Sequence, residues 1–299
     1  MVASSNRSVS SPGRTAPAGR FAAATATVAM LAGVAGVANV LLQIAYPLVH
    51  GESRRLVTIW SVAAFAAFSH LHALATRGWR AAVALFVVFA GGGWVAEAIG
   101  SRGPLPFGNY EYSSTLGWQV LGVPVVVALA WSMMGWLALL AGRRVARNWW
   151  GRAGFGAAIL TAWDLMLDPQ MVRSGHWSWQ RTPGPWLHGI PLVNSVGWFA
   201  VAFLLLVILD RLVPLDALST VSATDSAPKR ALIPSRDLAA WLMLLWTWFS
   251  ETLGHLVFFG SPTVGLVGGL VLGVVLVPWV SAVTVDLRPL MKRLQGLLR

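Results

Sequence analysis

Long apolar runs alternate with short polar connections along most of the chain. A helix needs about 20 apolar residues to cross the hydrocarbon core of a bilayer. The pattern therefore predicts an all-α fold, a polytopic transmembrane helix bundle with about eight spans. The apolar runs cover residues 21–46, 56–76, 80–100, 118–141, 153–168, 190–212, 238–259 and 262–285.

The 22 Lys and Arg residues are spread unevenly over the connections between these runs. Cytoplasmic loops of membrane proteins carry an excess of basic residues. If the N-terminus is cytoplasmic, most of the basic side chains fall in cytoplasmic segments. We therefore expect an even number of spans, both termini in the cytoplasm, and a multi-pass protein of the cell membrane. The basic residues left on the outer side are Arg54, Arg55, Arg102, Arg173 and Arg181.

The polar segments divide the chain into a membrane domain and its flanks. Residues 1–20 are rich in Ser, Pro, Ala, Gly and Arg, a composition typical of a disordered tail. Residues 21–285 form the predicted transmembrane helical domain. Within it, residues 213–237 are expected to be a flexible cytoplasmic linker, and residues 286–299 follow as a basic C-terminal tail.

Composition supports a membrane protein and excludes other classes. Of the 299 residues, 56% are hydrophobic and 11% are charged, whereas a soluble domain has about 25% charged residues. The net charge of +11 is dispersed between apolar runs, so we expect no nucleic-acid partner. The chain has no Cys, which excludes disulfides and thiolate chemistry.

Two acidic residues lie in the run 153–168, where charge is costly and is usually retained for function. Asp164 and Asp168 are four residues apart, which places them on one face of a helix. Pro169 follows directly, and we expect it to end the helix, because a proline disfavours helical geometry in the residue before it.

Five polar side chains from three predicted spans reach a similar depth. At about 1.5 Å per residue they fall in the outer half of a hydrocarbon core about 30 Å thick. This agreement predicts one polar site that opens toward the outer leaflet. Two simpler interpretations stay open: Asp168 lies in the interface, or Glu251 and His255 pair only structurally. The five residues are Glu97, Asp164, Asp168, Glu251 and His255.

The predicted site is suited to carbocation chemistry. Desolvation favours the protonated form of a carboxyl group in an apolar pocket, and such a group is a general acid. Aromatic faces stabilise cations. Two outer loops, residues 103–112 and 169–189, are rich in Gly, Pro, Trp and Tyr and are expected to fold back over the bundle. Together these features favour protonation of an alkene followed by capture of the cation.

Four motifs over roughly residues 90–285 resemble the CruF-type carotenoid hydratase family, which includes bisanhydrobacterioruberin hydratase. The residues that carry the resemblance are Gly103 and Pro104 together with Phe107, Gly108, Asn109, Tyr110 and Tyr112; Trp163, Asp164, Asp168 and Pro169; Gly175, Trp177 and Trp179; and Pro191, Asn194, Gly197 and Trp198.

The resemblance implies a carotenoid biosynthesis enzyme, a hydro-lyase that adds water to the terminal C1=C2 double bond of an acyclic carotenoid. From residue type and depth, we expect Asp164 to donate the proton and Asp168 or Glu97 to orient water and accept its proton. The expected partners are the carotenoid from the bilayer, water and membrane lipid, with no organic cofactor and no metal. Candidate substrate-binding residues are Asn109, Tyr112, Trp163, Trp177, Trp179, Asn194, Trp198, Glu251 and His255.

Other functions use part of the same pattern. A lycopene-type cyclase would share the protonation and trap the cation with a neighbouring alkene. A membrane prenyltransferase would hold Mg²⁺ on aspartates, but the second aspartate-rich cluster that it needs is missing from the sequence. A proton-coupled transporter could use the intramembrane acids as a relay, and a carotenoid-binding membrane protein could use the aromatic loops.

Overall fold

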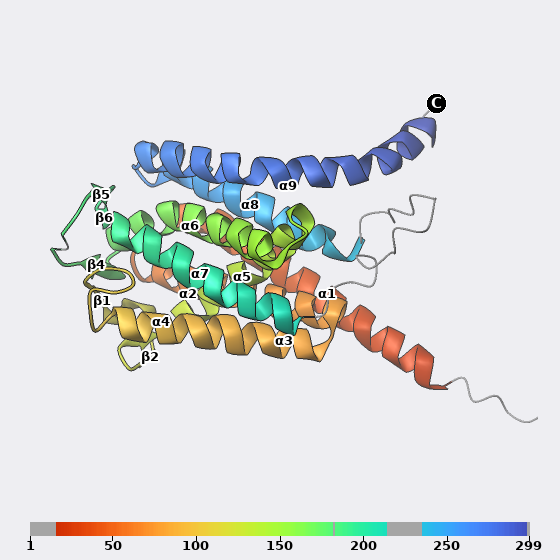
Figure 1. Cartoon of the computed structure of the whole chain (residues 1–299), viewed down its shortest axis with the longest axis horizontal. Helices are drawn as coiled ribbons and strands as arrows, with labels where there is room; N and C mark the ends of the chain where they lie inside the picture. Colours follow the sequence, from red (N-terminus) through yellow and green to blue (C-terminus); the bar gives the residue numbers. More distant parts are fainter. Residues whose placement is uncertain (1–15, 182, 214–234, 298–299) are drawn as a thin grey trace, which may run out of the picture.

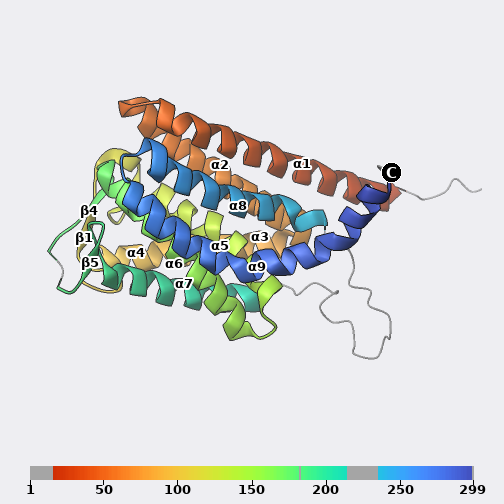
Figure 2. The ribbon, with the colours of Figure 1, turned by 90° about the horizontal axis from the view of Figure 1, so that it is seen from above.

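The structure is a computed structural model that describes residues 16–181, 183–213 and 235–297. Residues 1–15 of the predicted tail and 214–234 of the predicted linker lie outside the described residues. The described chain begins and ends at the same end of an elongated helix bundle (Figures 1 and 2).

Every apolar run predicted to be a span contains a helix. Two of the runs include a π-helical segment: Phe86–Gly91 joins α3 to α4, and Gly254–Phe258 extends α8. The helices are α1 (Ala16–Ala45), α2 (Gly51–Arg77), α3 (Trp79–Leu85), α4 (Gly92–Gly100), α5 (Val125–Val145), α6 (Trp149–Arg173), α7 (Leu192–Leu212), α8 (Leu238–Leu253) and α9 (Pro262–Leu297).

Six helical segments in the described part of the chain are long and apolar enough to cross a membrane. Neither α6 nor α8 belongs to this set, although both run alongside the other helices (Figure 2). Helix α8 has 16 residues, and α6 carries two aspartates in its apolar run. The six segments are Ala23–Leu48, Gly51–Arg77, Trp79–Gly100, Val125–Val145, Leu192–Leu212 and Pro262–Thr284.

Six short strands gather at one end of the bundle, which we call the strand end (Figure 1). They pair as three two-stranded antiparallel sheets, β1 with β4, β2 with β3, and β5 with β6. The opposite end, which carries Arg77, Arg143 and Arg152, is called the basic end. The strands are β1 (Tyr110–Tyr112), β2 (Gln119–Val120), β3 (Val123–Pro124), β4 (Trp177–Trp179), β5 (Trp186–Leu187) and β6 (Ile190–Pro191).

Several helix boundaries differ from those predicted. The run 118–141 becomes a helix only at Val125, because Leu121 and Gly122 have positive φ and turn β2 into β3. Helix α1 begins at Ala16, so the predicted disordered tail loses its last five residues to a helix. Helix α9 continues through residues 286–297 of the predicted C-terminal tail.

The prediction that Pro169 ends its helix was wrong. Helix α6 continues through Pro169 to Arg173, although a proline inside a helix removes one backbone hydrogen bond. Pro169, Gln170 and Met171 are all buried, so tertiary packing of this last turn outweighs the local preference. The longer helix keeps Asp168 within a regular turn.

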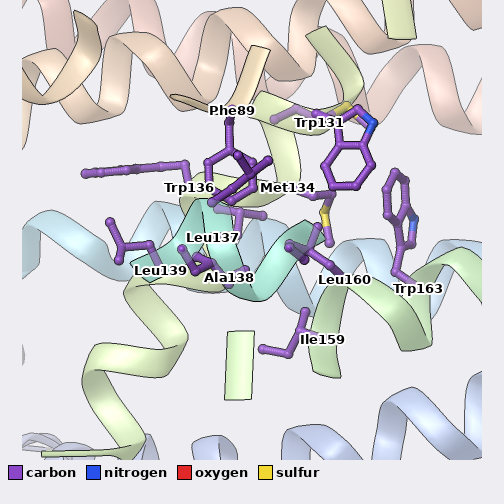
Figure 3. Packing of buried hydrophobic residues seen from close by; sticks show 14 of the residues in the cluster. Phe89, Trp131, Met134, Trp136, Leu137, Ala138, Leu139, Ile159, Leu160 and Trp163 are labelled. Atoms are coloured by element: carbon purple, nitrogen blue, oxygen red, sulfur yellow. The ribbon is translucent and has the colours of Figure 1, made fainter. Parts of the chain in front are cut away.

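Buried side chains of α5 and α6 pack together in the hydrophobic core (Figure 3). Helix α5 is buried without a break from Trp131 to Gly142. Gly135 allows the close packing of Phe89 against α5, because a Cβ there would lie 2.2 Å from the ring. The outer helices instead expose large apolar side chains, such as Trp60, as expected of surfaces that face lipid.

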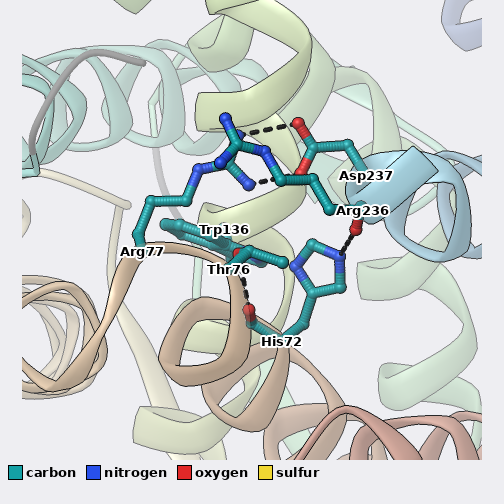
Figure 4. Close-up of polar contacts among 6 residues, drawn as sticks. All are labelled: His72, Thr76, Arg77, Trp136, Arg236 and Asp237. Atoms are coloured by element: carbon teal, nitrogen blue, oxygen red, sulfur yellow. Dashed lines mark hydrogen bonds and ion pairs between the residues drawn. The ribbon is translucent and has the colours of Figure 1, made fainter. Parts of the chain in front are cut away.

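Polar side chains at the basic end tie the start of α8 to α2 and α5 (Figure 4). Asp237 forms a buried ion pair with Arg77, in which Nη2 lies 2.7 Å from Oδ2. The indole of Trp136 donates to Nδ1 of His72 (3.0 Å), so Nε2 carries the proton and donates to the carbonyl of Arg236 (2.7 Å). These contacts give His72 a structural role.

Candidate active site

An aromatic lid, formed by Tyr110, Tyr112, Trp177 and Trp179, covers the strand end of the helices. Strand β1 pairs with β4, with Tyr110 opposite Trp179 and Tyr112 opposite Trp177. Alternate side chains of a strand point to opposite faces, so these four rings share one face while the residue between each pair is exposed. The two loops that were predicted to fold over the bundle therefore meet in this lid.

Glu97, near the end of α4, accepts hydrogen bonds from three buried donors. The hydroxyls of Tyr110 and Tyr112 donate to Oε2, the second at 2.8 Å, and Nε1 of Trp131 donates to Oε1 at 2.9 Å. One turn earlier, Gly93 leaves the space for this indole, because a Cβ there would lie 2.4 Å from Trp131. Glu97 thus ties the lid to α4 and α5.

Both lid phenols remain hydrogen-bond donors. Burial raises the pKa of Tyr110 and of Tyr112, and the neighbouring Glu97 raises each pKa further. The hydroxyl groups therefore stay protonated at physiological pH, and Glu97 acts as their acceptor.

A second polar cluster consists of Asp164, Asp168 and Asn194, all three buried. Asn194, in the first turn of α7, donates from Nδ2 to Oδ2 of Asp164 (2.9 Å) and to Oδ2 of Asp168 (2.5 Å). Among the described residues, Oδ1 of Asp164 is buried and has no hydrogen-bond partner. The i, i+4 spacing therefore brings both carboxyl groups to one amide nitrogen, which holds α6 against α7.

Indole rings form the wall beside these carboxyl groups. Trp131 and Trp198 stack with their centroids 4.1 Å apart and their planes at 8°, and Trp163 meets Trp198 edge-on at 6.2 Å. Phe107 packs against both stacked rings. The loop that holds Pro106 and Phe107 packs closely against α7 because Gly197 has no side chain. A Cβ at this position would lie 2.3 Å from the Pro106 carbonyl oxygen.

The lid, the indole wall and the acidic side chains enclose an aromatic cavity of about 60 Å³. By the measure in which one water needs about 10–15 Å³, this is room for a few waters or a small branched hydrocarbon group. No Lys or Arg is among the described residues that line it. Its polar lining residues are Thr58, Glu97, Asp168 and Asn194, together with Tyr110 and Tyr112.

A family model described as carotenoid biosynthesis protein matches residues 55–244, which is more than half of the chain. The chain belongs to this family. The matched segment contains every residue that lines the aromatic cavity. Neither the curated proteins nor the solved structures searched gave a match. Membership, together with the apolar helices, makes this a membrane protein with a role in carotenoid biosynthesis.

In this member of the family, most of the predicted site residues line the aromatic cavity. Asp164 does not line the cavity, but it accepts a hydrogen bond from Asn194, which does. Asn109 lies just before β1, where its carbonyl accepts from the backbone N–H of Gln180 (2.8 Å), and it is also absent from the lining. The predicted residues that line the cavity are Glu97, Tyr112, Trp163, Asp168, Trp177, Trp179, Asn194 and Trp198.

The residues predicted to form a single site do not all lie together, because those at the end of α8 do not line the aromatic cavity. Glu251 lines a second, neighbouring cavity and not the aromatic one. His255 lines neither: its Nδ1 lies 2.8 Å from the Ser261 hydroxyl and its Nε2 lies 3.0 Å from the Met166 carbonyl. The structural pairing of Glu251 with His255 is therefore not formed, since both ring nitrogens have other partners.

Three aromatic residues of the cavity were not among the predicted site residues. Tyr110 belongs to the same alternating segment as Tyr112, and this period of two could have identified it. Phe107 belongs to the same loop motif. Trp131 lies in the middle of an apolar helix, where the sequence does not distinguish an indole that binds a carboxylate from one that fills the core.

No group of three or more His, Cys, Asp or Glu side chains in the described part of the chain is placed to hold a metal ion.

Proposed function

We propose that this protein hydrates the terminal C1=C2 double bond of an acyclic carotenoid end to a tertiary alcohol. The observation that carries the proposal is the position of Asp168, in the wall of an aromatic cavity and bridged by Asn194 to a second carboxyl group. The motif resemblance to carotenoid hydratases supports the same reaction. We also propose that the protein lies in the cell membrane with the strand end outside, and that the carotenoid enters from the bilayer.

The carboxyl pair is the source of the proton. Two carboxyl groups that meet at one donor in a water-poor site hold one proton between them, because like charges so close do not both ionise. Asp168 is the member of the pair that lines the cavity. This arrangement reverses the order expected from depth, in which Asp164 was the donor, and makes Asp164 the group that shares the proton.

The reaction begins when Asp168 transfers its proton to C2, so that the π electrons form the new C–H bond and leave a tertiary cation at C1. Water then adds through oxygen to C1, and its extra proton returns to the carboxyl pair. Each turnover consumes one water and regenerates the acid.

The surrounding side chains stabilise the cation. The stacked indoles of Trp131 and Trp198 and the edge-on Trp163 present electron-rich rings, and cation–π contacts of this kind contribute about 2 kcal/mol when desolvated. Glu97, as a carboxylate with three donors, adds a fixed negative group to the same cavity.

The proposal is tested by expressing the protein in cells that accumulate lycopene and analysing the extracts by mass spectrometry. The expected product is heavier than its precursor by one water, and growth in heavy-oxygen water should label its hydroxyl group. A product with the mass of lycopene but a cyclised end would instead identify a cyclase, which shares the protonation step. If neither appears with any acyclic carotenoid, the proposal is wrong.

Replacing the carboxyl groups tests their assignment. Asp168→Asn and Asp164→Asn keep the shape and remove the acid, so alcohol formation should fall by about 10²–10⁴-fold, the contribution typical of a general acid. Glu111→Gln is the matched control, because Glu111 is exposed between the two lid tyrosines. Undiminished turnover in Asp168→Asn, at equal amounts of folded protein, would contradict its role.

A further inference from the structure

A polar cavity of about 90 Å³ lies next to the aromatic cavity. At about 10–15 Å³ for each water, it has room for several waters. Helices α1, α2, α6 and α8 contribute its walls, so it lies inside the bundle. Its polar lining residues include Gln43, Ser61, Gln170, Thr247, Ser250 and Glu251.

Two acceptors of this polar cavity lack a partner. Among the described residues, Oε2 of Glu251 and Oε1 of Gln170 are buried and form no hydrogen bond. A buried acceptor left unsatisfied costs about 1–3 kcal/mol, and more for a charged group. Water in the polar cavity would satisfy both groups, whereas an apolar ligand would not.

The polar cavity borders another hollow on each side. It shares six lining residues with the aromatic cavity, so one layer of side chains separates the two. On the other side it shares Tyr46, Gln170 and Phe259 with an open cleft of about 410 Å³. The residues shared with the aromatic cavity are Thr58, Val62, Met133, Trp163, Leu167 and Met171.

The open cleft lies at the strand end and has polar side chains in its walls. Arg54, Arg173 and His176 line it, and His176 also lies 2.8 Å through Nδ1 from the hydroxyl of Thr115. Burial lowers the pKa of His176, and the nearby Arg55 lowers it further, so the imidazole is neutral at physiological pH.

We propose that the polar cavity is the water route of the active site. Water enters through the open cleft, is held by Gln170 and Glu251, and passes the partition at Leu167 and Met171 to reach the cation at C1. The inference rests on the proposed hydration. It gives the two reactants separate entrances, since the carotenoid arrives from the bilayer and water arrives through the protein.

Glu251 acts here as a positioning residue. Its Oε2 accepts a hydrogen bond from water and takes no part in the proton balance, since the proton lost by the water returns to the carboxyl pair. If water does not add to C1 quickly, the cation instead loses a proton and returns to the alkene. In deuterated water, that reversal leaves deuterium in the recovered carotenoid.

The test compares two products of the same cation, alcohol and deuterated carotenoid, from purified protein in deuterated water. Ser250→Leu fills the polar cavity, and Glu251→Leu removes its acceptor. In both variants we expect the ratio of alcohol to deuterium exchange to fall by about tenfold. Glu251→Gln, which keeps an acceptor, should restore most of the ratio. Ser281→Leu, the same change on an exposed face of α9, is the matched control.

The ratio does not depend on the amount of folded protein, because misfolding lowers both products together. An unchanged ratio in Ser250→Leu and Glu251→Leu would overturn the water route while the hydratase stands. Wild-type protein that forms neither alcohol nor deuterated carotenoid would instead overturn the proposed function.

A measurement without substrate tests the water route whether or not the protein is a hydratase. Hydroxyl radicals generated from water should oxidise Met171, which is buried but lines both cavities. We expect Ser250→Leu to reduce the rate of this oxidation by about tenfold relative to Ser281→Leu. Equal oxidation of Met171 in the two variants would overturn the inference.

Discussion

Glu97 has more hydrogen-bond partners than either aspartate of the site. It accepts from Tyr110 and Tyr112 in the lid and from Trp131 in α5, and it is buried. Hydrogen bonds to a charged group contribute about 1.5–3 kcal/mol each, roughly twice as much as neutral ones. Glu97 is therefore as important for closing the cavity as for the chemistry inside it.

Removing this acceptor should loosen the lid. Glu97→Gln places an amide NH₂ among three donors, so we expect a loss of several kcal/mol of stability, and more than the roughly 1.5–3 kcal/mol for Tyr112→Phe, which removes one donor. Thermal unfolding in detergent measures both changes. The control is Glu111→Gln, on the exposed face of β1. Equal midpoints for Glu97→Gln and the control would contradict this role.

Residue types predicted most of the side chains that gather at the aromatic cavity, but not their division between two cavities. Acids in an apolar run identified Glu97, Asp164 and Asp168 because charge in a membrane is costly. Depth along a helix says nothing about rotation around it, so the sequence places Glu251 and His255 in the same site. In the structure, Glu251 lines the polar cavity and His255 bonds to Ser261 and to the Met166 carbonyl.

At the level of elements, the cavity depends on the close approach of α7 to the loop that holds Phe107. Gly197 permits this contact with the Pro106 carbonyl oxygen. Elsewhere in the bundle, a Cβ added at Gly154 of α6 would lie 4.0 Å from its nearest neighbour, an atom of the Phe203 ring. The two helical glycines thus differ in whether a methyl group fits.

The same substitution should have opposite effects at these two positions. Gly197→Ala should destabilise the protein by about 1–3 kcal/mol through overpacking and reduce alcohol formation, because the Phe107 wall is displaced. Gly154→Ala should stabilise it by up to about 1 kcal/mol, since alanine is the better helix former. Thermal unfolding of both variants checks the signs. Unchanged thermal stability of Gly197→Ala would show that the loop that holds Phe107 shifts without cost.

Hydrophobic periodicity predicted which segments are helical but not where they end. The run 118–141 reads as continuous because Val120, Leu121 and Val123 are apolar, yet positive φ at Leu121 makes a hairpin there. At Pro169 the local preference was overruled by burial of the following turn. The first error concerns a local turn and the second concerns tertiary packing, and the pattern of apolar residues contains neither.

For the whole molecule, the main expectation is its orientation in the membrane. The chain has no native Cys, so single cysteines can be labelled without background. Ser178→Cys lies on the exposed face of the lid, and Arg147→Cys lies between α5 and α6 at the basic end. A membrane-impermeant maleimide added to intact cells should label position 178 and leave position 147 unlabelled. The reverse pattern would show that the strand end faces the cytoplasm.

Helix α5 is buried without a break from Trp131, which lines the aromatic cavity, to Gly142, so packed side chains surround the helix beyond the cavity. In the proposed hydration, a long rod-shaped carotenoid would therefore insert one tip and would not thread through the protein. Its other tip would stay in the lipid until the first is released, so the proposed reaction should be distributive and not processive. In a time course, the singly hydroxylated carotenoid should build up before any doubly hydroxylated product; simultaneous appearance of both from the earliest times would contradict a one-ended cavity.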